Sequence, residues 1–144
     1  MIREQLVGTW RLKSCELRRS DGKSAYPYGT KPVGQLMYDA AGNMSVQVMK
    51  PDRPKFSVND KFEGSAEEVK SAFDGFECYF GRYEVGEDKK TVTHHIEGSL
   101  LPNWEGKPQE RFFEFSGDRL SLASPPTRYA GATITSFLIW ERKT

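Results

Sequence analysis

Two adjacent histidines, His94 and His95, are the side chains of this sequence best suited to acid–base chemistry, and Glu97 follows them closely. An imidazole titrates near neutral pH, and a carboxylate beside it can orient the ring. Side chains alternate between the two faces of a strand, so one imidazole should face the interior and the other solvent. We favour His95 as the interior residue because Glu97 shares its face. The alternative places His94 inside with Val92 and Ile96, and either histidine could instead only hydrogen-bond a neighbouring strand.

A second set of candidates consists of aromatic side chains that could line a pocket. Aromatic rings give flat, weakly polar contact area, which suits an apolar molecule with a few oriented polar groups. The same rings could instead fill a small barrel as its core. Together with the histidines, the expected ligand-binding residues are Tyr38, Tyr79, Tyr83, His94, His95, Trp104 and Phe113.

Several other kinds of chemistry are not expected. Adjacent histidines on a strand point apart, and Cys15 and Cys78 form no ligand cluster, so we expect no metal site. The sequence has neither a glycine-rich phosphate loop before a helix nor a Gly-x-Ser-x-Gly motif. We therefore expect no cofactor and no serine hydrolase.

Length and charge limit the architecture and the partners. The 144 residues suit one domain spanning residues 1–144. The 21 basic and 20 acidic residues are scattered and leave a net charge of +1, which argues against nucleic acid as a partner. No stretch is apolar enough to cross a membrane, and no secretion-signal pattern begins the chain. With two cysteines expected to be free thiols, these features favour a cytoplasmic protein of unspecified oligomeric state.

Segments typical of strands recur along the chain with turn residues between them. Alternation places Arg82 and Glu84 towards water, and Tyr79 and Tyr83 towards the interior. Eight strands can close into an antiparallel barrel that holds one small ligand, so we predict an all-β, up-and-down barrel of eight or slightly more strands. The eight expected segments are residues 8–19, 34–39, 43–49, 77–86, 91–100, 109–116, 119–123 and 132–142.

One short amphipathic helix is predicted over residues 66–75. Ser65 followed by Glu68 forms a capping box. Apolar residues then recur at spacings of three and four, from Val69 to Phe76. After the long loop at residues 50–59, this helix could form a lid over the barrel mouth or plug its other end.

The two ends of the chain carry a family resemblance. Gly8-Thr9-Trp10 begins the first strand and Trp140-Glu141-Arg142 ends the last one, which resembles the lipocalin and wider calycin pattern. The resemblance implies that Arg142 packs across the Trp10 indole at a closed end of the barrel. A guanidinium stacks well on tryptophan, so the contact is physically sound.

The chain is more closely similar to a bacterial and fungal group described as lipocalin-like domain proteins. The similarity extends from Leu6 to Arg142. It implies the barrel fold but assigns no activity. The segments that carry it are residues 6–12, 34–38, 42–46, 79–83, 94–104 and 117–120.

Two functions fit these features. The first is a carrier or sequestering protein that binds a small, largely apolar molecule inside the barrel. The alternative is a cofactor-independent enzyme, such as an isomerase or cyclase, with His94 or His95 as acid or base. Binding is favoured because the sequence lacks a convergent nucleophile, base and oxyanion donor.

Overall fold

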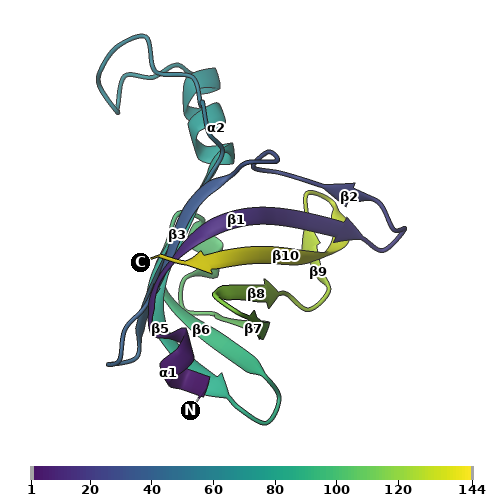
Figure 1. Cartoon of the computed structure of the whole chain (residues 1–144). Coiled ribbons are helices and arrows are strands. Elements are labelled where there is room, and N and C mark those ends of the chain that lie inside the picture. The colour runs from purple at the N-terminus through teal and green to yellow at the C-terminus, as the bar shows by residue number, and fades with distance from the viewer. Residues whose placement is uncertain (1, 144) are drawn as a thin grey trace.

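Eight antiparallel strands form a closed barrel in the computed structural model, which describes residues 2–143 (Figure 1). Along the chain, each of these eight strands pairs with the next of the eight. The first, β1 (Gly8–Arg19), also pairs with the last, β10 (Ala132–Arg142), with Trp10 opposite Arg142. The predicted up-and-down barrel is confirmed, and the ends of the eight predicted segments agree with the strands to within one residue. The strands are β1 (Gly8–Arg19), β3 (Val33–Tyr38), β4 (Asn43–Met49), β5 (Phe76–Gly86), β6 (Thr91–Ser99), β7 (Pro108–Ser116), β8 (Arg119–Ala123) and β10 (Ala132–Arg142).

Four short elements of the described chain were not predicted. Strand β2 (Ser24–Ala25) pairs with β1, and strand β9 (Thr127–Tyr129) pairs with β10. Helix α1 (Ile2–Leu6) precedes β1, and the 3-10 helix η1 (Pro102–Trp104) lies between β6 and β7. These elements have two to five residues, which is too short to show a hydrophobic period.

The barrel has a closed end where β1 begins and β10 finishes. The Arg142 guanidinium lies 4.2 Å from the centre of the Trp10 indole, as the family resemblance implies. Arg142 also donates to the carbonyl oxygens of Val7 (3.0 Å) and Gln5. Gly8 has a φ of +137°, and a Cβ there would lie 2.8 Å from Arg142 Nη1. The glycine of the Gly-x-Trp motif is thus needed both for its backbone conformation and for the close approach of the arginine.

Side chains inside the barrel fill the half nearest this end, which we call the closed half. Trp10, Val92 and Leu120 are at most 1% exposed there. Helix α1 adds Leu6, whose carbonyl oxygen accepts a hydrogen bond from Trp10 Nε1. The opposite half, which we call the open half, ends in the longer connections between strands.

Helix α2 (Ala66–Asp74) begins at the predicted capping box: Ser65 Oγ accepts from the Glu68 backbone, and the Glu68 carboxylate accepts from the Ser65 backbone. The helix buries no residue and stands off from the barrel (Figure 1). It is therefore neither a plug nor a lid in this structure. The helix ends at Asp74, one residue before the predicted end, because Gly75 caps it, and Phe76 begins β5. Within residues 2–143, no helix is long and apolar enough to span a bilayer.

A candidate binding cavity in the open half of the barrel

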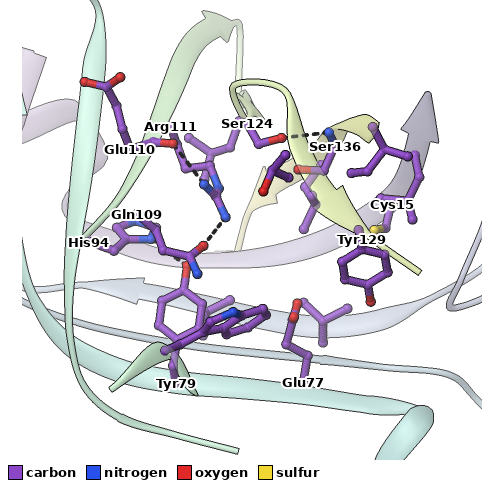
Figure 2. Close-up of a pocket in the computed structure, with 18 of the residues that line it drawn as sticks. Cys15, Glu77, Tyr79, His94, Gln109, Glu110, Arg111, Ser124, Tyr129 and Ser136 are labelled. Atoms are coloured by element: carbon purple, nitrogen blue, oxygen red, sulfur yellow. Dashed lines mark hydrogen bonds between the residues drawn. The ribbon is translucent and has the colours of Figure 1, made fainter. Parts of the chain in front are cut away.

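The open half contains a cavity of about 310 Å³, within the range of small-molecule sites (Figure 2). All eight strands of the barrel contribute side chains to it. Much of the wall is aliphatic, so the cavity suits an apolar body. The aliphatic lining residues are Leu17, Leu36, Val46, Val48, Leu122, Ile134 and Leu138.

Three hydrogen-bonded side chains form a layer between the cavity and the closed half. His94 Nε2 lies 2.6 Å from the Tyr38 hydroxyl, and His94 Nδ1 lies 2.7 Å from the Tyr79 hydroxyl. Burial, with the charges of Arg111 and His95, lowers the pKa of His94 from 6.5 to about 3. The imidazole is therefore neutral at physiological pH and both of its nitrogens have partners.

Glu77 brings a carboxyl group to the cavity wall. It lies two residues before Tyr79 on β5, and therefore on the same inward face. Burial raises its pKa from 4.5 to about 7, although the positive charge of Arg111 opposes the shift. Within residues 2–143, Glu77 has no hydrogen bond or ion pair. Figure 2 shows its carboxyl group pointing into the cavity from the β5 side.

Arg111 supplies the positive charge of the cavity from β7. Its Nη1 donates to the Glu110 carbonyl oxygen over 2.9 Å, and its Nη2 donates to Gln109 Oε1. These bonds hold the guanidinium on the side of the cavity opposite Glu77 (Figure 2). The lining has two acidic and two basic residues. Glu77 and Arg111 are part-buried on different walls, whereas Glu110 and Arg128 are exposed.

The connections at the open end add further polar groups. The hydroxyls of Tyr28 and Tyr129 lie 3.4 Å apart, and Ser124 Oγ accepts from the Ser136 backbone over 2.9 Å. Cys15 also lines the cavity, and burial together with the charge of Glu77 raises its thiol pKa to about 12. This thiol is protonated at neutral pH and is a poor nucleophile.

Of the predicted ligand-binding residues, Tyr79, His94 and Trp104 line the cavity. Trp104 packs edge-on against Tyr79, with ring centres 6.2 Å apart. Tyr38 is buried beneath His94. Tyr83 and Phe113 pack in the closed half: Tyr83 lies edge-on to Tyr38 and donates to the Asp39 carbonyl oxygen, and Phe113 packs on Phe115.

The expectation that His95 faces the interior with Glu97 is wrong. Both side chains are exposed, and His95 Nε2 lies 3.7 Å from Glu84 Oε1 on the outer surface. His94 faces inward with Val92 and Ile96, which are at most 2% exposed. The reason is desolvation, because this arrangement buries two aliphatic side chains and a neutral ring and leaves the Glu97 carboxylate in water.

The cavity is also lined by residues that were not predicted from the sequence: Glu77, Arg111, Tyr28 and Tyr129. A signal existed for the first two, because Glu77 shares the parity of Tyr79, and Arg111 that of Phe113. A charged residue at an inward position of a predicted strand marks a polar group inside a barrel. No comparable signal exists for Tyr28 and Tyr129, which lie in a connection and in the three-residue strand β9.

An eight-stranded up-and-down barrel with a packed closed end and an internal cavity is the architecture of the lipocalin-like proteins. Residues 7–143 match the lipocalin-like domain family, and the chain belongs to that family. It is similar to the 4'-hydroxy-3'-methoxypropiophenone carrier protein ppsC of Aspergillus oryzae (strain ATCC 42149 / RIB 40). The two are 35% identical over 106 residues, covering 69% of this chain and 96% of that protein. Among solved structures, a REP1-NXSQ fatty acid transporter matches with a TM-score of 0.43 and 11% identity over 98% of each chain.

Proposed function

We propose that this protein is a carrier that binds one small, largely apolar aromatic molecule in the cavity of the open half. The observation that carries the proposal is the cavity itself, which lies in a barrel whose other half is fully packed. The relative from Aspergillus oryzae, named as the carrier of an aryl ketone, supports the same function. Tyr79, His94 and Trp104 are proposed to contact the ligand.

The alternative of an enzyme with a histidine acid or base receives no support from the geometry. Both nitrogens of His94 are engaged with tyrosine hydroxyls, and the imidazole pKa is about 3. The His95 side chain is on the outer surface, away from the cavity. Binding without chemistry is therefore the function that we propose.

A cytoplasmic location also belongs to this proposal. Cys15 and Cys78 are free thiols, which is the usual state of cysteines in a reducing compartment. We also propose that neither nucleic acid nor a membrane is a partner.

The proposed function is tested by filling the cavity. Ser136 lines it, so Ser136→Trp places an indole where a ligand would lie without removing a buried aliphatic side chain. Its neighbour Thr135 points to the other face of β10, so Thr135→Trp is the matched control. Native mass spectrometry and calorimetry with 4'-hydroxy-3'-methoxypropiophenone should show one molecule bound per chain in the parent and in Thr135→Trp.

Binding to Ser136→Trp should be at least tenfold weaker, while its melting temperature stays close to that of the parent. Equal affinity in all three proteins would place the ligand outside the cavity. The proposed function would be overturned if the parent protein bound neither this ketone nor related aryl ketones.

A further inference from the structure

The cavity contains a carboxyl group that the packing of the protein does not use. Glu77 has no hydrogen-bond or ion-pair partner in the described part of the chain, and its part-buried carboxyl group points into the cavity. Buried polar groups nearly always have a partner, because an unpaired one is costly. The partner of Glu77 therefore comes from the cavity, as water or as a group of a bound ligand.

The Tyr38–His94–Tyr79 layer contains a second group without a partner, and the tautomer of His94 identifies it. Tyr38 is 2% exposed, and its hydroxyl has one hydrogen-bond partner within residues 2–143, which is His94 Nε2. The hydroxyl proton needs an acceptor, so Nε2 must be the unprotonated nitrogen of the neutral ring. The proton of the imidazole then lies on Nδ1 and is donated to the Tyr79 oxygen.

This tautomer leaves the hydroxyl proton of Tyr79 without an acceptor in the described chain. Tyr79 lines the cavity, and burial raises its pKa to about 12, so the hydroxyl stays protonated. The hydrogen bond from His94 fixes the oxygen, and the edge of Trp104 packs against the ring. Tyr79 is thus a positioned hydrogen-bond donor at the floor of the cavity.

The donor and the acceptor lie at different depths along one strand. Glu77 precedes Tyr79 by two residues, a rise of about 6.6 Å on a strand. Since β5 begins at the open end, Glu77 lies nearer the mouth and Tyr79 nearer the closed half. Aliphatic side chains such as Val46, Val48 and Leu122 line the space around them. An aromatic ring that lies along β5 with polar substituents at opposite ends presents them at different depths in the same way.

We propose that the cavity selects an aromatic ring with a hydrogen-bond acceptor at one end and a donor at the other. The acceptor, such as a ketone oxygen, binds the Tyr79 hydroxyl at the floor. The donor, such as a phenolic hydroxyl, binds the Glu77 carboxyl group towards the mouth. This inference rests on the proposed function and adds the ligand class and its orientation.

The test of the Glu77 end compares two ligands in three proteins. The ligands are 4'-hydroxypropiophenone and 4'-methoxypropiophenone, in which a methyl group replaces the phenolic proton. The proteins are the parent, Glu77→Leu, and Glu84→Leu as the matched control on the outer face of β5, where Glu84 is 80% exposed. A phenolic donor favours the ionised form of Glu77, and hydrogen bonds to charged groups are strong, so the parent and the control should prefer the hydroxyl ligand by about tenfold or more. Glu77→Leu should lose this preference and bind the methoxy ligand at least as tightly as the parent does.

The result that overturns the Glu77 assignment is a preference that stays within twofold of the parent value in Glu77→Leu. If that variant does not fold, the parent alone decides, because equal affinity for the two ligands contradicts the inference. Failure of both ligands to bind the parent would instead count against the proposed function. The two failures are thus distinguishable.

The Tyr79 end is tested without a substitution, by measuring the His94 tautomer. A ¹H–¹⁵N correlation spectrum of the parent should show the His94 proton on Nδ1 and an unprotonated Nε2. Binding of propiophenone, but not of propylbenzene, should shift the hydroxyl resonance of Tyr79. A proton on Nε2, or equal responses to the two ligands, would overturn the assignment of Tyr79 as the donor.

Discussion

The closed and open halves of the barrel have the same strands and the same alternation of side chains, yet only one of them is packed. In the closed half, Trp10, Phe115 and Leu120 fill the interior, and Trp10 Nε1 has its partner in the Leu6 carbonyl. In the open half, a 310 Å³ cavity remains and the Glu77 carboxyl group has no partner in residues 2–143. The layer of Tyr38, His94 and Tyr79 separates them. The same eight strands thus pack one half of the barrel for stability and leave space for a ligand in the other half.

The largest expected effect comes from removing a side chain of the closed half. Trp10→Ala deletes a fully buried indole and its contact with Arg142, and such truncations cost about 3–5 kcal/mol in the free energy of unfolding. The matched change in the open half is Trp104→Ala, which removes a half-buried indole at the cavity. Urea unfolding should show a clearly smaller loss for Trp104→Ala. Equal losses would mean that the two halves contribute alike to stability.

The second effect is a pH dependence that arises from Glu77. Its pKa is about 7 in the folded protein and 4.5 in the unfolded reference, so the folded state binds the extra proton between these values. Its contribution to stability is complete below pH 4.5 and is lost as the pH rises through 7, by at most about 3 kcal/mol. Glu77→Gln removes this loss, so the variant should gain stability relative to the parent across this window.

His94 changes the free energy of unfolding in the opposite direction over the same pH range, and Glu77→Gln should reveal this contribution. Its pKa is about 3 when folded and 6.5 in the reference, so its contribution is present above pH 6.5 and is lost as the pH falls towards 3. The parent should therefore show a nearly flat unfolding free energy between pH 4.5 and 6.5, whereas Glu77→Gln should become more stable with rising pH. Parallel profiles of the two proteins would contradict this assignment.

A smaller loss of stability is expected from a substitution in the hydrogen-bonded layer between the two halves. Tyr38→Phe removes the hydrogen bond to His94 Nε2 and should cost about 1–2 kcal/mol. Tyr83→Phe removes a bond of similar length, to the Asp39 carbonyl oxygen in the closed half, and should cost no more. Only Tyr38→Phe should also weaken ligand binding, because it releases His94 to change tautomer. Equal effects of both variants on affinity, measured by calorimetry, would exclude this role for the layer.

The features that could be predicted from the sequence depend on short-range signals. Turn residues and alternation marked the eight strands, and the capping box at Ser65 and Glu68 marked helix α2. The Gly-x-Trp motif and Arg142 marked the closed end, because the first and last strands must pair to complete the barrel.

The features that could not be predicted depend on tertiary contacts. Alternation separates His94 from His95 but does not say which of them faces inward, since this depends on how β6 packs in the barrel. The apolar stripe of helix α2 does not indicate whether the helix packs on the barrel, and in the structure the helix buries no residue. Tyr28 and Tyr129 meet across 101 residues of chain, with no local signal for the contact.

The central claim is that ligand binds in the open half and leaves the closed half unchanged, and methyl-resolved NMR tests it most directly. Reporters in the open half are Val46, Val48, Leu122, Ile134 and Leu138, and reporters in the closed half are Leu6, Met44, Val92 and Leu120. Titration with 4'-hydroxy-3'-methoxypropiophenone should give saturable shifts, with one-to-one stoichiometry, in the first set and little change in the second. Shifts of equal size in both sets, or shifts confined to surface residues of helix α2, would contradict the account.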